Sequence, residues 1–457
     1  MNGIDELAGF ITDLRADNVA AGTLEKLRLH VADTIGAWVA ATKTPEGELL
    51  IAFARQSHPR SDDFDGVALH CALTRLSEID DIHLASMTTP GSIVIPAALT
   101  LASEMADVDS GDVVAAIIGG YEAMIRFGLA VKGPNILYRG IWPTYFAAGI
   151  ATAAVAARLM RLDRSETAQA LALALVMASP TVGQHHAATT ARWLLVGNAA
   201  RSGLAAAYAA QAGFTADTDA LNSRLFPDVY GIEPDAGMIS QAAAGEVALA
   251  RVSFKPWCAA RQTMAATQAL RELLDDGVTV ADITDVTAFV LPPHLKMIDH
   301  GIKSGNRASF LTSLPYQLAM VALHPDDMLN LGQPAETALP PLQAFMERIK
   351  VAADDALLAE YPSSWPARIV VTTKSGRYER RVRDIPGDPA HPFRETDIRN
   401  KFQDAAAPVL DERTAAFLQS ALTVLSSRDS LSSVMRNLNQ LVSRVAHPND
   451  VPAGRAS

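Results

Sequence analysis

Apolar residues recur at helical spacing through the first half of this 457-residue chain, and this spacing constrains the fold more than any other feature. One such stripe consists of Leu24, Leu27, Val31, Ile35 and Trp38. Glycine and proline interrupt the pattern between residue 7 and about residue 241, as expected at the ends of helices. The spacing predicts a helical bundle, and we expect residues 1–250 to form one large all-α domain.

The second half of the chain carries the signals of β-strands. Residues 283–291 are rich in β-branched side chains and end before two prolines, which predicts a strand. Ala367–Thr373 and Arg377–Val382 flank a Lys-Ser-Gly turn, and this arrangement predicts a β-hairpin. Residues 311–323, between these strands, have helical spacing. We therefore expect a smaller α+β domain over residues 251–404.

Helical spacing resumes after Pro392 and continues through residues 410–441. Residues 405–446 are expected to return to the first domain, and residues 447–457 to form a flexible tail. The predicted fold class is therefore mainly α, with a large all-α helical domain plus a smaller α+β domain.

Charge and composition argue against several classes of protein. The formal net charge of -11 disfavours a nucleic-acid surface. Two cysteines, Cys71 and Cys258, are too few for a disulfide framework or an all-cysteine iron–sulfur cluster. The N-terminus is acidic where a secretory signal is basic, and the most apolar segments, residues 93–102, 146–160 and 168–180, are shorter than the roughly 18 residues of a membrane span. We expect a cytoplasmic protein without a membrane or nucleic-acid partner.

Three short segments bring together carboxylates, hydroxyls, cations and aromatic side chains. They are residues 80–91 (DDIHLASMTTPG), 139–144 (RGIWPT) and 254–264 (FKPWCAARQTM). These segments resemble active-site segments of the MmgE/PrpD family. Further runs resemble the family in the same order along the chain: ADTIG at 32–36, GYE at 120–122, AGFT at 212–215 and PGDP at 386–389. The resemblance covers about residues 32–410.

The resemblance to this family implies both an architecture and a class of reaction. It implies a homodimer in which the smaller α+β domain is a lid and the active site lies between the two domains. It also implies an enzyme without cofactor or metal that dehydrates, decarboxylates or epimerises small polycarboxylates. All these reactions exchange a proton at a carbon next to a carboxylate, which requires an acid or base of suitable pKa.

Three positions at which the family pattern carries histidine have other residues here, namely Thr89, Trp142 and Met264. Histidine suits proton transfer near neutral pH, and none of these three side chains replaces it as a base. We therefore expect the family's proton relay to be absent and the three residues to line the substrate site. A fourth position, where the family carries lysine, has Arg192 and keeps its positive charge.

The first segment retains acid–base candidates. His83 lies close to Asp80 and Asp81, and a carboxylate partner would fix its tautomer. By family position Asp81 is the better candidate for a catalytic carboxylate. The alternatives are a structural hydrogen bond for His83 and a helix-capping or buried role for one aspartate. A metal site is not expected, because adjacent aspartates seldom converge on one ion.

Two histidines and three cations complete the candidate site. His186, beside His185, borders the site in the resemblance and is a catalytic candidate, although a solvated or packing role is the alternative. Arg192, Lys255 and Arg261 are expected to bind the substrate carboxylate, since guanidinium groups bind carboxylates in a bidentate manner. Structural ion pairs are the alternative for each.

The leading hypothesis is a divergent, cofactor-independent lyase or isomerase acting on a small carboxylate-bearing substrate. The rival is a pseudoenzyme or small-molecule-binding protein that keeps the fold and has lost turnover. A third hypothesis is that Ile82, Trp142 and Met264 reshape the cavity so that it binds a more apolar ligand. In the leading hypothesis, residues 80–96, 138–144, 185–197 and 255–264 converge on one cavity.

Overall fold

The structure is a computed structural model that describes residues 2–57, 63–178, 189–240 and 247–445. The expected tail, residues 447–457, lies outside this described part. The described residues divide into two compact units, one drawn from residues 2–57, 63–178, 190–240, 247–252 and 395–445 and the other from residue 189 and residues 253–394. The second unit thus ends at Arg394, whereas the sequence placed this boundary at residue 404.

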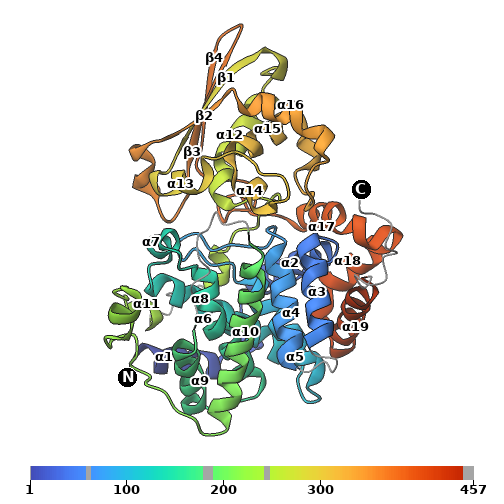
Figure 1. Cartoon of the computed structure of the whole chain (residues 1–457). Helices are drawn as coiled ribbons and strands as arrows, with labels where there is room; N and C mark the ends of the chain where they lie inside the picture. The colour runs from blue at the N-terminus through green and yellow to red at the C-terminus, as the bar shows by residue number, and fades with distance from the viewer. Residues whose placement is uncertain (1, 58–62, 179–188, 241–246, 446–457) are drawn as a thin grey trace. The chain divides into compact units, whose positions relative to one another are not determined.

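The first unit is helical, which confirms the expected all-α part of the fold (Figure 1). Its helices are α1 (Gly3–Asp13), α2 (Ala21–Ala41), α3 (Pro45–Ser57), α4 (Asp63–Leu76), α5 (Gly91–Glu104), α6 (Ser110–Ala130), α7 (Gly133–Ile136), α8 (Pro143–Leu159), α9 (Arg164–Val176), α10 (Ala191–Gln211), α11 (Gly237–Ser240), α17 (Glu395–Leu410), α18 (Thr414–Leu422) and α19 (Arg428–Arg444).

Helix α8 is the centre of this unit, and all of its residues are buried. It packs against α5, α6, α9 and α10. Small residues let these helices approach closely: a Cβ atom added to Gly203 of α10 would lie 2.0 Å from the Gly149 carbonyl oxygen of α8. Gly203 is therefore required where α10 crosses α8.

Helix α6 is long and apolar enough to cross a membrane by length and composition alone. It is longer than the apolar segments 93–102, 146–160 and 168–180, which are too short for a span. Within its most apolar window, 94% is buried inside the unit, as is typical of a core helix.

Helix α17 returns the chain to the first unit and packs on α2. The Lys401 ammonium of α17 lies 2.7 Å from Asp33 Oδ1 of α2 and donates a hydrogen bond of 2.7 Å to the Ile79 carbonyl oxygen. All three groups are buried, so this contact fixes the returning helix by charge as well as by packing.

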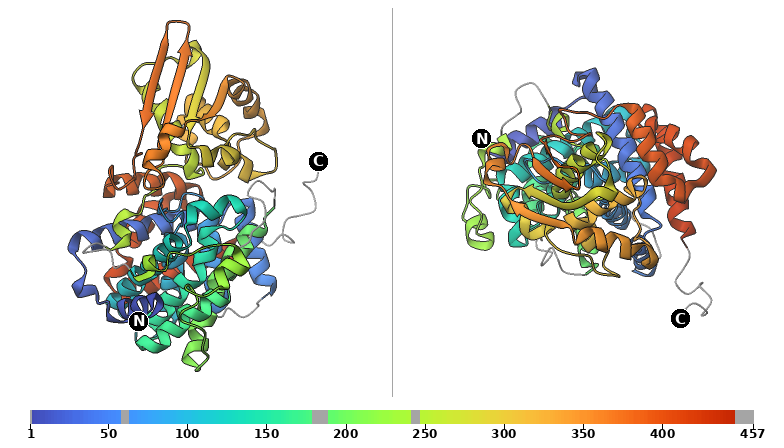
Figure 2. Two further views of the ribbon diagram at one scale, coloured as in Figure 1. Left: turned by 90° about the vertical axis from the view of Figure 1, so that its left-hand side faces the viewer. Right: turned by 90° about the horizontal axis from the view of Figure 1, so that it is seen from above.

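The second unit contains a four-stranded sheet in the order β2-β1-β3-β4, which confirms the smaller α+β part. Its strands are β1 (Ile283–Val290), β2 (Ile349–Ala353), β3 (Ala367–Thr373) and β4 (Arg377–Val382). The predicted hairpin is confirmed, and β3 and β4 form the orange antiparallel ribbon in Figure 2. Strand β2, which pairs in parallel with β1, is short and half-exposed at the sheet edge and was not predicted.

Helices of the second unit follow or interrupt these strands. They are α12 (Arg261–Asp275), α13 (Leu295–Ile298), α14 (Arg307–Thr312), α15 (Leu314–Leu323) and α16 (Leu339–Met346). The apolar side of α12 packs on β3 and β4. The single helix expected near residues 311–323 is in fact α14 followed by α15, because Ser313 ends the first and caps the second by accepting the Tyr316 amide.

Candidate functional site

Two of the motif segments meet through buried hydroxyl groups at the beginnings of α5 and α8. Thr144 Oγ1 accepts the Thr89 amide at 3.0 Å and lies 3.2 Å from Thr89 Oγ1. Thr89 Oγ1 is also 3.2 Å from Ser92 Oγ. Thr89 is therefore part of a small hydroxyl cluster, which offers weak donors and acceptors and no base.

The segment 139–144 contacts Arg192 through Trp142. Arg192 lies in the first turn of α10 and is 6% exposed. Its guanidinium carbon is 4.9 Å from the ring centroid of Trp142 and 4.9 Å from that of Trp193. Such cation–π contacts are stronger when the cation is desolvated. The residue that stands at a family histidine position is thus in contact with the predicted carboxylate-binding cation.

Tyr145 belongs to the same group, and the sequence analysis missed it. Its ring packs edge-to-face on Trp142, with centroids 5.4 Å apart and planes at 82°. Both side chains are buried, yet among the described residues neither Trp142 Nε1 nor Tyr145 Oη has a hydrogen-bond partner. A buried donor left unsatisfied costs about 1–3 kcal/mol. The only signal in the sequence that could have linked Tyr145 to Trp142 is that it follows three residues later, across the start of α8.

Charges near Tyr145 act in both directions on its hydroxyl. Burial raises the pKa of Tyr145 to about 12; the positive charges of Arg75 and Arg192 oppose that rise, and the negative charges of Glu78 and Asp80 add to it. Arg75 of α4 is itself paired with Glu78 at 3.1 Å and Asp80 at 3.2 Å. The phenol therefore stays protonated near neutral pH beside two guanidinium groups.

Asp80 and Asp81, although adjacent in sequence, contact different partners. While Asp80 pairs with Arg75, the Asp81 carboxylate accepts the Gly91 amide at the start of α5 at 2.7 Å. Asp81 Oδ2 accepts the Tyr121 hydroxyl, also at 2.7 Å. A Cβ atom at Gly91 would lie 2.7 Å from Asp81 Oδ2, so only glycine permits this approach. These contacts fit the alternative role of Asp81 as a buried residue that caps helix α5. Its catalytic role stays a prediction.

His30 of α2 is a further partner of Asp81 that the sequence analysis missed. Its Nδ1 lies 2.9 Å from Asp81 Oδ2, and the side chain is fully buried. Burial lowers the pKa of His30, and hydrogen bonding to Asp81 opposes the shift. Nearby, burial raises the pKa of Asp33 to about 6 against the effect of Lys401. A single histidine in an apolar helix gives no signal of this pairing, because its partner is distant in sequence.

His83 closes a tight turn within the first segment. Its amide donates to the Thr88 carbonyl oxygen at 2.8 Å, and its Nδ1 accepts the Ser86 amide at 3.2 Å. Ser86 Oγ, 2.9 Å from the same nitrogen, is also 2.7 Å from Thr88 Oγ1. Burial lowers the pKa of His83 to about 4. These are structural hydrogen bonds of a neutral imidazole, and its catalytic role stays a prediction.

The other catalytic histidine candidate, His186, lies outside the described residues, as does His185. Within the described ranges, no group of three His, Cys, Asp or Glu side chains is arranged to hold a metal ion.

The segment 254–264 lies in the second unit. Arg261 Nη2 is paired with Asp388 Oδ2 at 2.7 Å, and both side chains are buried. Among the described residues, Arg261 Nε and Nη1 have no hydrogen-bond partner. Lys255 and Met264 are also buried. The ion pair with Asp388 is a structural contact, and it leaves two N–H groups of Arg261 without a partner in the described residues. That residues 80–96, 138–144, 185–197 and 255–264 converge on one cavity stays a prediction.

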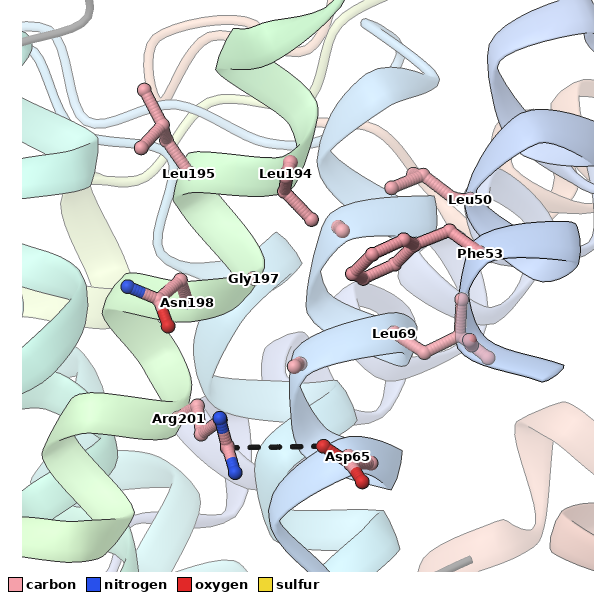
Figure 3. A pocket seen from close by; sticks show the side chains of 12 residues that line it. Leu50, Phe53, Asp65, Leu69, Leu194, Leu195, Gly197, Asn198 and Arg201 are labelled. Carbon is pink, nitrogen blue, oxygen red and sulfur yellow. Dashed lines mark ion pairs between the residues drawn. The ribbon is translucent and has the colours of Figure 1, made fainter. Parts of the chain in front are cut away.

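An apolar groove of about 280 Å³ lies on the first unit, between α3, α4 and α10 (Figure 3). Leu50, Phe53, Leu69 and Leu194 line it, and Arg201 and Asp65 form an ion pair of 3.8 Å at one end. None of the catalytic or substrate-binding candidates lines this groove, so it is separate from the site at Arg192.

Comparisons with known proteins agree with the resemblance found in the sequence. The MmgE/PrpD N-terminal domain model matches residues 5–234, and the MmgE/PrpD C-terminal domain model matches residues 257–426. A cis-aconitate decarboxylase of Aspergillus terreus is 25% identical over 228 residues, 46% of each chain. A cis-aconitate decarboxylase-like protein of Aspergillus oryzae is 24% identical over 230 residues, 46% of this chain and 47% of its own. The chain thus spans about half the length of the curated relatives it matches.

Proposed function

We propose that this chain, which belongs to the MmgE/PrpD family, is a cofactor-independent lyase or isomerase that binds a small carboxylate-bearing substrate at Arg192. The observation that carries the proposal is the buried Arg192 guanidinium against Trp142, beside two buried donors without partners in the described residues. The relatives named as cis-aconitate decarboxylases support the lyase class and a polycarboxylate ligand.

A carboxylate suits this group of side chains for physical reasons. Its oxygens accept only, while the Arg192 guanidinium, Trp142 Nε1 and Tyr145 Oη all donate. Hydrogen bonds between an ionised donor and a carboxylate are worth about 1.5–3 kcal/mol, and the indole face of Trp142 keeps water from the guanidinium. The substrate would then be oriented by Arg192 with its reacting carbon near α8.

The rival proposal is a pseudoenzyme or binding protein. It is favoured by the engagement of the inherited candidates in internal bonds: Asp81 caps α5 and His83 closes a turn. A rival of this kind would bind carboxylates at Arg192 without converting them.

Thermal denaturation with a panel of di- and tricarboxylates tests the proposal. A ligand of the folded state raises the melting temperature as its concentration exceeds the dissociation constant. We expect Arg192→Ala to weaken binding roughly 10- to 150-fold, the equivalent of the bond energy above. Arg201→Ala, on the same helix but at the apolar groove, is the matched control and should bind like the wild type. If the carboxylates raise the melting temperature of Arg192→Ala as much as that of the wild type, the proposed site at Arg192 is refuted.

We also propose that the protein is a cytoplasmic homodimer. The family resemblance supports the dimer, and the two free cysteines, Cys71 and Cys258, suit a reducing compartment. Sedimentation of the purified chain at micromolar concentration should give twice the 48.6 kDa protomer mass, and a monomer would contradict the proposal.

A further inference from the structure

Tyr145 occupies a position from which its hydroxyl shares the surroundings of Arg192. It lies in the first turn of α8, is 1% exposed and packs on Trp142, whose ring also contacts Arg192. Trp142 is the N-cap residue of α8, and its ring packs edge-to-face on Tyr145, so the two side chains are neighbours beside Arg192.

The Tyr145 hydroxyl lacks the partner that a buried tyrosine normally has. The equally buried Tyr121 shows the usual case, since it donates to Asp81 at 2.7 Å. Among the described residues Tyr145 Oη has no such acceptor, and neither has Trp142 Nε1 beside it. A carboxylate bound beside Arg192 would supply acceptor oxygens to both donors.

The protonation state of Tyr145 selects among the reactions open to a lyase. A dehydratase or epimerase must first take a proton from carbon, which a protonated phenol does not do. A decarboxylase needs only an acid that gives a proton to the carbon left behind. Burial and the carboxylates of Glu78 and Asp80 raise the energy of the tyrosinate that forms when this proton leaves, and the guanidinium groups of Arg75 and Arg192 partly offset that cost.

We propose that Tyr145 is a catalytic residue that protonates the substrate carbon in a decarboxylation at the Arg192 site, an inference that rests on the proposed function. The bond between that carbon and the departing carboxylate breaks, carbon dioxide leaves, and the electron pair stays on the carbon. The O–H bond of Tyr145 then breaks, and its proton forms the new C–H bond. The tyrosinate recovers a proton from water.

The test compares wild type with Tyr145→Phe, using cis-aconitate, trans-aconitate and oxaloacetate as probes. Release of carbon dioxide gives kcat, deuterium incorporation in D2O locates the new C–H bond, and calorimetric titration gives Kd. We expect Tyr145→Phe to lower kcat roughly 100-fold or more while Kd changes far less. Tyr230→Phe, which removes a half-buried hydroxyl elsewhere in the unit, is the control and should keep its kcat.

The outcomes separate this inference from the proposed function. Unchanged kcat in Tyr145→Phe, or wild type that binds the probes without releasing carbon dioxide, overturns the inference and leaves the Arg192 site standing. If the probes bind neither the wild type nor Arg192→Ala, both the inference and the proposed function are overturned. The melting temperatures of the ligand-free proteins detect a merely structural role of the Tyr145 hydroxyl. Tyr145→Phe should melt at the wild-type temperature or above it. A markedly lower melting temperature would show that the hydroxyl forms a hydrogen bond within the protein and would count against the inference.

Discussion

Replacing Asp81 with asparagine separates a structural from a catalytic role for this carboxylate. Asp81 accepts two hydrogen bonds of 2.7 Å, from the Gly91 amide and the Tyr121 hydroxyl, and lies 2.9 Å from His30 Nδ1. An asparagine in the same place keeps one acceptor oxygen and turns an amide donor toward either Tyr121 or His30. If the capping contacts define the role of Asp81, the variant folds less stably.

The expected magnitude follows from the bonds. Each charge-assisted bond is worth about 1.5–3 kcal/mol and a neutral one about 1 kcal/mol, so the loss of one and the weakening of the other remove about 2–4 kcal/mol. Part of this is offset because a buried carboxylate is no longer desolvated. We therefore expect a net loss of about 1–3 kcal/mol in the free energy of unfolding.

Denaturant unfolding and amide hydrogen exchange measure this effect. The exchange of the Gly91 amide should accelerate in Asp81→Asn, because its acceptor is weakened. Asp107→Asn, an exposed aspartate of the same unit, is the control and should unfold like the wild type. Wild-type stability in Asp81→Asn together with lost turnover would refute the structural reading and restore Asp81 as a catalytic carboxylate.

Two further predictions concern titration and the missing histidines. Asp33 binds its proton more tightly in the folded protein, with a pKa of about 6 against an ordinary 3.8, so its contribution to stability is present below pH 3.8 and is lost as pH rises through about 6. Urea unfolding from pH 4 to 6 should therefore show a smaller decline of stability with rising pH in Asp33→Asn, by roughly 1–3 kcal/mol, and an equal decline would contradict the assignment. Thr89→His alone should not give turnover of 2-methylcitrate, because a catalytic base needs a partner that sets its tautomer, and the groups that the Thr89 hydroxyl contacts in the described residues are the hydroxyls of Ser92 and Thr144. Product analysis that shows efficient dehydration would contradict this prediction.

Local signals predicted the architecture where they were strong. The bounds of β3 and β4 follow from the Lys-Ser-Gly turn between two short runs, and the structure has them as predicted. Strand β2 has five half-exposed or exposed residues and pairs in parallel with a strand far away in sequence, so no local pattern marks it. Its position depends on tertiary pairing, which periodicity does not encode.

The candidate site was less predictable for a similar reason. Trp142 and Arg192 could be chosen from their motif positions, but their contact with each other depends on the packing of α8 on α10. His30 and Tyr145 lie within apolar helical stripes, where a polar atom is indistinguishable from a satisfied core residue. Only the structure shows that His30 faces Asp81 and that the Tyr145 hydroxyl has no partner in the described residues.

The indole N–H resonance of Trp142 tests carboxylate binding at Arg192 most directly. The chain has five tryptophans, so ¹⁵N-labelled indole signals are few, and Trp142→Phe assigns the one of interest. Titration with cis-aconitate should move the Trp142 Nε1–H signal downfield as the donor gains an acceptor, and Arg192→Ala should abolish the shift while Arg201→Ala leaves it intact. A Trp142 signal that stays in place while cis-aconitate binds, or that moves equally in Arg192→Ala, would contradict the account.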